Sequence, residues 1–134
     1  MCTSIISNRN KTIVGWNLDI KDMEHRVITS VLWIVPGQGY RYFEKPEYKV
    51  MTNFSPYKMN AEGHPWMGWD RYQTAERMLS GATDDFDVDD CFRILEAVSQ
   101  TVCPTVVSKV FDVSEHTVHW CENREWNHRK RIDL

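Results

Sequence analysis

Apolar and polar residues alternate along the start of the chain with a period of two, which is typical of β-strands. Residues 2–7 and 11–18 are two such runs, and the polar letters NRN separate them. Two strands joined by a short polar segment predict an antiparallel hairpin. The run YKVMT at 48–52 predicts a further short strand that ends at Asn53.

The middle of the chain contains a second region of high β-propensity. Residues 25–43 are rich in Val, Ile and aromatic side chains, and the letters PGQG at 36–39 interrupt them. We expect two strands joined by a tight turn there. Residues 53–69 follow neither the strand period nor the helix period, so we expect a loop, and loops of this length are uncommon unless they are functional.

The period changes to that of a helix from Asp70 onward, and Gly81 supplies a C-terminal stop. The residues on its apolar face are Tyr72, Ala75, Met78 and Leu79. A second helix is expected after Asp87, whose side chain suits an N-cap, and Pro104 prevents its continuation. Its apolar stripe consists of Cys91, Leu95 and Val98, flanked by Phe92 and Ile94.

The end of the chain returns to strand-like runs. Residues 105–113 and 116–123 predict a closing hairpin around the letters SEH at 114–116. The order of strands, helices and strands predicts an α+β fold in which helices cover an antiparallel sheet. A chain of 134 residues has the size of one domain, so we expect a single domain over 1–134.

Charge and composition remove several function classes. The formal net charge is −3, and apart from HRKR at 128–131 the basic residues are scattered, so we expect no nucleic-acid partner. No apolar run reaches the length of a membrane span and the first residues lack a signal-peptide layout, so we expect a cytoplasmic protein without membrane contact. The four cysteines show no metal-binding or disulfide spacing, so we expect neither zinc nor disulfides.

Cys2 directly follows the initiator methionine. Methionine removal, which is common before a small residue, would leave one residue that carries both a thiol and a free α-amine. The α-amine has an ordinary pKa of about 7.7 to 8.0, so its neutral fraction can accept the thiol proton, as in N-terminal threonine nucleophiles. The sequence therefore predicts Cys2 as a nucleophile that carries its own base.

Asn17 and Asp19 are two residues apart on one expected strand, so their side chains point to the same face. If this strand pairs with the strand that starts at Cys2, the carboxylate of Asp19 approaches the α-amine. A slip of two residues in the pairing would remove this contact.

Four short motifs occur in one order: MCTSI at 1–5, GWNLD at 15–19, VMTNFSPY at 50–57 and WDRYQTAERML at 69–79. Together with AVSQTVCPTVVSKVFDV at 97–113 and WCENREWN at 120–127, they resemble the choloylglycine hydrolase and penicillin V acylase family of N-terminal-nucleophile cysteine amidases. The resemblance implies an N-terminal-nucleophile hydrolase-type α+β fold, with antiparallel sheets between helical layers. It also implies hydrolysis of a linear amide, a non-peptide C–N bond, through an acyl-enzyme.

The resemblance also implies roles for individual residues. Cys2 is the nucleophile, and Asp19 is the partner of its amine and thiol. Asn53 matches the family's side-chain oxyanion donor, Arg71 its buried active-site arginine, and Asn17 a support residue. The resemblance further implies no cofactor, no metal, small N-acyl amide substrates such as penicillin V or conjugated bile acids, and a homo-oligomer.

Two departures from the family pattern bear on activity. Trp16 stands where the bile-salt branch carries an arginine, as in the broader amidase branch. Family members also carry a long insertion that this chain lacks, so it looks like a member with an internal deletion between about residues 30 and 31. The sheets would then lose strands and expose edges. The alternative function is a catalytically inactive remnant that acts as a structural or binding subunit.

Each site residue also has a simpler interpretation, which the sequence leaves open. Cys2 can be a packing cysteine, Asp19 a strand-end turn former and Asn53 an Asx turn. Arg71 can be a solvated helix residue. Helix capping explains the acidic run at 84–90 better than calcium binding, because the run lacks the glycine and the terminal glutamate of a calcium loop.

Overall fold

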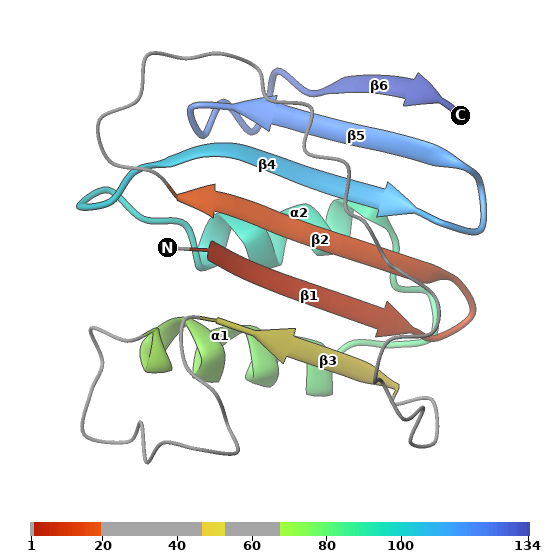
Figure 1. The fold of residues 1–134 in the computed structure, drawn as a ribbon. Helices are drawn as coiled ribbons and strands as arrows, with labels where there is room; N and C mark the ends of the chain where they lie inside the picture. The colour runs from red at the N-terminus through yellow and green to blue at the C-terminus, as the bar shows by residue number, and fades with distance from the viewer. Residues whose placement is uncertain (1, 20–46, 53–67) are drawn as a thin grey trace, which may run out of the picture.

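The computed structural model describes residues 2–19, 47–52 and 68–134. Their elements are β1 (Cys2–Asn8), β2 (Thr12–Asp19), β3 (Tyr48–Met51), α1 (Trp69–Ser80), α2 (Val88–Ala97), β4 (Thr105–Asp112), β5 (Thr117–Glu122) and β6 (Lys130–Asp133). The strands form one antiparallel sheet in the order β3-β1-β2-β4-β5-β6, and both helices lie on the same face of it (Figure 1). The α+β class expected from the sequence is confirmed.

The predicted N-terminal hairpin is confirmed as β1 and β2, which pair antiparallel with Cys2 opposite Leu18. Odd-numbered residues of both strands are buried, and even-numbered residues are partly exposed. Ile5 and Ile13 thus join the core under the helices, whereas even-numbered side chains point to the other face of the sheet.

Gly15 lets α2 approach the sheet closely. A Cβ atom at this position would lie 2.4 Å from Sγ of Cys91 and 3.0 Å from Cγ1 of Ile5, which is too close for ordinary contact. α2 contacts both β2 and β4. Any larger residue at position 15 would therefore push α2 away from these strands.

α1 begins one residue earlier than the sequence predicts. It ends at Ser80, so Gly81 is the C-terminal stop as predicted, and the Gly81 N–H bonds to the Arg77 carbonyl at 3.3 Å. Its buried residues are Arg71, Ala75 and Leu79. They are about one helical turn apart and therefore share one face, which packs on the sheet. Tyr72 and Met78, also expected on the apolar face, are partly buried against the core. The sheet-facing stripe of α1 thus starts with a charged residue.

α2 is capped as the sequence predicts. Asp87 Oδ1 accepts from the Asp90 N–H at 2.9 Å, and Asp90 Oδ2 accepts from the Asp87 N–H at 3.2 Å, so the two residues form a capping box. The buried face consists of Cys91, Phe92, Ile94 and Leu95. Capping therefore explains this part of the acidic run.

The closing hairpin is confirmed as β4 and β5, and β6 extends the sheet beyond the prediction. All residues of β6 are exposed, and Lys130, Arg131 and Asp133 are charged. Such a strand shows no alternation of apolar and polar residues, because neither of its faces enters the core. Its strand state comes from pairing with β5.

Three of the predicted features lie outside the described residues. These are the two strands within 25–43, the loop residues 53–67 and the point of the internal deletion between about residues 30 and 31. β3 confirms the short strand predicted at 48–52. No helix in the described ranges is long and apolar enough to cross a membrane.

Candidate active site

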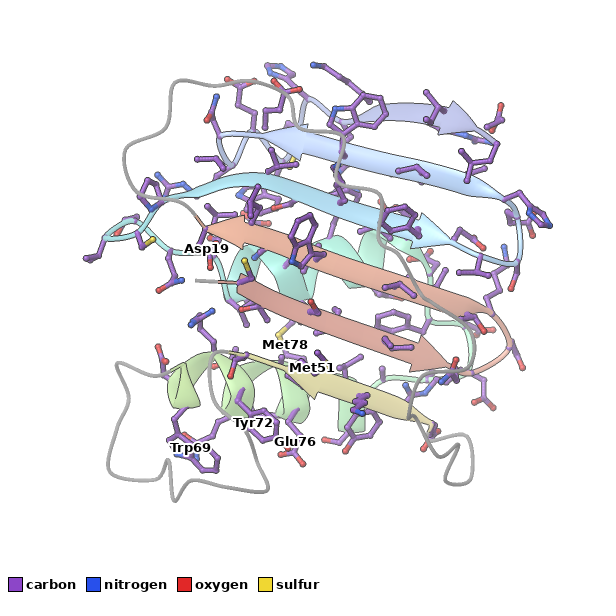
Figure 2. All side chains as sticks on the ribbon, in the orientation of Figure 1. Asp19, Met51, Trp69, Tyr72, Glu76 and Met78 are labelled. Carbon is purple, nitrogen blue, oxygen red and sulfur yellow. The ribbon has the colours of Figure 1, made fainter. Side chains whose placement is uncertain are left out.

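Buried polar side chains gather where β1 begins and β2 ends. The members of this polar cluster are Thr3, Asn17, Asp19, Arg71, Thr105 and Ser108. Each is at most 5% exposed, although buried polar groups are unfavourable unless they are hydrogen-bonded. The rest of the core under the helices is mainly apolar, and Figure 2 shows Asp19 at the end of β2.

The register of β1 and β2 decides which part of Cys2 faces the polar cluster. Cys2 pairs with Leu18, so strand alternation sends its side chain to the face away from the helices. Asp19, the next residue of β2, is 2% exposed on the helix-facing side, beside the amino end of β1. The pairing that brings Asp19 toward the amino group of Cys2 is therefore present, without the slip that would remove it.

Arg71 brings a positive charge to the same point from α1. Its Nη1 lies 2.7 Å from Thr3 Oγ1, 3.3 Å from the Cys2 carbonyl oxygen and 3.6 Å from Asp19 Oδ2. Arg71 is 5% exposed, so its interpretation as a solvated helix residue is wrong. The guanidinium instead joins the buried carboxylate to the start of β1.

Gly68 makes room for this guanidinium. It precedes α1 with φ of +91°, a left-handed conformation that favours glycine. A Cβ atom here would lie 2.6 Å from Nη2 of Arg71 and 3.1 Å from Cβ of Thr52. The position of Arg71 therefore depends on the lack of a side chain at position 68.

Asp19 accepts hydrogen bonds from two residues far away in the sequence. Thr105 Oγ1 donates to Oδ1 at 2.5 Å, and Gln100 Nε2 donates to Oδ2 at 2.7 Å. Burial raises the pKa of Asp19 above its ordinary value of 3.8. The two hydrogen bonds, the charge of Arg71 and the chain's N-terminal amino group act in the opposite direction. Burial therefore outweighs the combined effect of these neighbours on the pKa of Asp19.

Asn17 and Asp19 share the helix-facing side of β2, as predicted. The Asn17 side-chain amide donates to the Leu95 carbonyl at 2.7 Å, and its Oδ1 accepts from Ser108 Oγ at 2.6 Å. These contacts tie β2 to α2 and to β4 just before Asp19. Asn53, the predicted oxyanion donor, lies outside the described residues.

A bulge in β4 brings Thr105 to the carboxylate. Leu18 pairs with Val107, but Asp19 pairs with Thr105, so Val106 is skipped. Thr105 is 1% exposed, and its hydroxyl belongs to the polar cluster because of this irregularity.

Thr3, Gln100 and Thr105 contact the predicted site residues but are not themselves among the residues predicted from the sequence. The signal for Thr105 is the pair of adjacent valines at 106–107, which breaks the alternation of a regular strand. Thr3 and Gln100 carry no comparable signal, because neutral polar residues are common in strands and loops.

The four cysteines differ in burial, and Cys2 is more exposed than two of the others. Cys91 and Cys121 are buried, and burial raises the pKa of both thiols, to about 11 for Cys121, so they stay protonated near neutral pH. Cys2 and Cys103 are partly exposed. In the described part of the chain, no three His, Cys, Asp or Glu side chains lie together in a way that suits a metal ion.

No protein-family model, no curated protein and no solved structure matches this chain. The family resemblance therefore stays a prediction from the motifs. The geometry itself provides a buried carboxylate and a buried guanidinium at the amino end of a strand that begins with a cysteine.

Proposed function

We propose that this chain is a cysteine amidase with an N-terminal-nucleophile hydrolase-type fold, which hydrolyses linear amides of small N-acyl substrates through an acyl-enzyme on Cys2. The observation that carries the proposal is the register of β1 and β2, because it leaves the carboxylate of Asp19 beside the amino end of β1. A buried carboxylate and guanidinium contribute little stability compared with apolar residues of the same size, so their presence points to a function.

The first half-reaction uses two groups of one residue. After removal of Met1, the α-amine of Cys2 takes the thiol proton, and the thiolate attacks the amide carbonyl carbon. The C–S bond forms while the carbonyl π-electrons move to oxygen, which gives a tetrahedral oxyanion. The C–N bond then breaks, and the leaving amine takes the proton from the α-ammonium group.

Water completes the cycle by attacking the thioester. The α-amine takes one of its protons, the C–S bond breaks, and the released thiolate recovers that proton. Asp19 holds the amine, and Arg71 holds the Cys2 carbonyl oxygen at 3.3 Å, so the nucleophile keeps one orientation. We assign Asn53 as the side-chain donor that stabilises the oxyanion.

Apolar acyl groups suit the surroundings of Cys2. Its strand neighbour Leu18 lies on the same face of the sheet. Met51, which pairs with Ser4, also lies on this face and is 54% exposed (Figure 2). Penicillin V and conjugated bile acids each carry a large apolar acyl group, and an N-acylated lactone is a third test substrate.

Hydrolysis of penicillin V by the wild type, Cys2→Ser and Cys103→Ser tests the proposal. Cys103 is partly exposed like Cys2, so its variant controls for unspecific thiol chemistry. We expect Cys2→Ser to lower kcat/KM by on the order of 10³-fold or more and Cys103→Ser to leave it within about twofold. An equal rate in Cys2→Ser contradicts the proposal and favours the alternative of a structural or binding subunit.

A further inference from the structure

We infer that Gln100 and Thr105 are positioning residues, which hold the carboxylate of Asp19 charged and aimed at the amino end of β1. This inference rests on the proposed function, because it concerns the group that holds the nucleophile's amine. Both residues touch Asp19 through neutral hydrogen-bond donors, and neither approaches the site from α1 or β1.

The direction of the Thr105 hydroxyl is set by the backbone. The Gln100 N–H donates to Thr105 Oγ1 at 2.9 Å, and the Thr105 N–H donates to the Gln100 carbonyl at 3.0 Å. Thr105 Oγ1 thus already accepts a hydrogen bond from one side. Its single proton is left for Asp19 Oδ1 at 2.5 Å.

Gln100 serves the other carboxylate oxygen. Its Nε2 lies 2.7 Å from Oδ2 of Asp19, and only the NH₂ end of the amide can donate to a carboxylate. The two bonds between Gln100 and Thr105 close a ring across the turn at 101–104. One turn therefore supplies an oriented donor to each oxygen of the carboxylate.

The bulge in β4 supports a dedicated role for Thr105. Continuing the register of Ile13 with Asp112 would place Val106 opposite Asp19, and the bulge places Thr105 there instead. A bulge disrupts the regular ladder and re-aims a side chain. Here it replaces an apolar contact by the hydroxyl that the carboxylate needs.

In the described part of the chain, Arg71 brings a charged side chain to Asp19 from α1. The chain's N-terminal amino group also acts on Asp19 and lowers the pKa of its carboxyl group. β4 and the turn after α2 contribute the neutral donors Thr105 and Gln100. Hydrogen bonds to the charged form favour it, so each lost donor makes Asp19 take up its proton at a higher pH.

The first test follows the Asp19 side-chain carboxyl carbon by NMR during a pH titration, with Asp19→Asn identifying the signal. We expect Thr105→Val and Gln100→Leu each to move the titration midpoint to higher pH, and Thr105→Ser to restore the wild-type value. Thr117→Val is the matched control, because Thr117 is also a buried β-strand threonine but pairs with Asp112 at the other end of β4. Unchanged midpoints in both Thr105→Val and Gln100→Leu overturn the inference.

The second test measures the acylation rate of Cys2 by penicillin V against pH. The acidic limb should move to higher pH in Thr105→Val, with the rate at the low-pH end lower by on the order of tenfold, and Thr105→Ser should retain the wild-type profile. A stability loss without a shifted limb overturns the inference. If the wild type is never acylated while the NMR midpoint still shifts, the proposed function fails and the positioning of Asp19 stands.

Discussion

Asp19 and Asp112 occupy equivalent places at opposite ends of the sheet, but their side chains have different kinds of hydrogen-bond partner. Each is the last residue of its strand, and they are 2% and 5% exposed. Asp112 accepts from the Glu115 N–H at 2.9 Å and lies 3.5 Å from Lys11, so it forms the turn between β4 and β5. Asp19 instead takes donors from a distant turn and from β4. Burial and position in a strand are therefore alike for the two carboxylates, and only the origin of their hydrogen-bond partners distinguishes them.

The cavity and the candidate active site also lie at different ends of the sheet. A cavity of about 570 Å³ lies at the Asp112 end, between the start of α2 and strands β4 to β6. Its charged side chains include pairs that bind one another, such as Lys11 with Glu115 and Arg129 with Asp89. We place the reaction at the Cys2 end, because the residues that line this cavity include no cysteine.

Neutralising the two carboxylates gives the largest expected difference. Asp19→Asn should lower the acylation rate of Cys2 by on the order of 10²-fold or more, because the amide cannot hold the α-ammonium as a carboxylate does. Asp112→Asn should leave the rate within about twofold, since an asparagine oxygen still accepts from the Glu115 N–H. Single-turnover acylation followed by mass spectrometry measures both, and equal losses would remove the distinction between the two ends.

Removing the cationic partner of Asp19 should lower the free energy of unfolding much more than removing the cationic partner of Asp112. Arg71→Met leaves the Asp19 carboxylate buried without its guanidinium, which should lower the free energy of unfolding by about 3 to 5 kcal/mol. Lys11→Met should have no measurable effect, because the Lys11 side chain is 42% exposed. Urea unfolding of both variants checks this, and a small effect of Arg71→Met would contradict the described pair.

Two glycines provide a smaller and independent test. Gly68→Ala should lower the free energy of unfolding by about 1 to 3 kcal/mol, because φ at Gly68 is +91° and the added Cβ would meet Arg71. Gly81→Ala is the control, since its φ is −87° and its nearest Cβ contact would be 3.5 Å. We expect this control to stay within about 1 kcal/mol of the wild type in the same urea experiment.

The pH dependence of stability gives the smallest effect. Because the folded pKa of Asp19 is raised above 3.8, the folded protein binds more protons than the unfolded chain between these two values. The free energy of unfolding should therefore fall in this window as the pH rises. The difference between the wild type and Asp19→Asn should show this decline in urea unfolding at a series of pH values, and a rising difference would contradict the sign.

Much of the fold follows from local patterns in the sequence. Alternation predicts β1, β2, β4 and β5, and the helical period with Asp87 and Gly81 predicts α1 and α2. β6 escapes prediction because its charged residues show no period and its strand state depends on β5. The local sequence pattern thus predicts elements that bury one face, but it does not predict an edge strand that buries neither face.

The candidate site is less visible in the sequence. The register that brings Asp19 to the amino end of β1 follows from the short hairpin, so this contact could be expected. The burial of Arg71 could be expected from its spacing to Ala75 and Leu79, but its charge argued for solvent. The donors lie more than 80 residues from Asp19 in the chain. The adjacent valines at 106–107 are the one signal for Thr105, because they mark the bulge, and Gln100 has no comparable signal.

The most direct test of the central claim is intact mass spectrometry of the folded protein before and after incubation with penicillin V. The proposal predicts loss of Met1 and one acyl adduct, which peptide mapping places on Cys2 and which Cys2→Ser lacks. A retained Met1, or a processed Cys2 that stays unmodified in folded protein, would contradict the claim that this residue is an activated nucleophile.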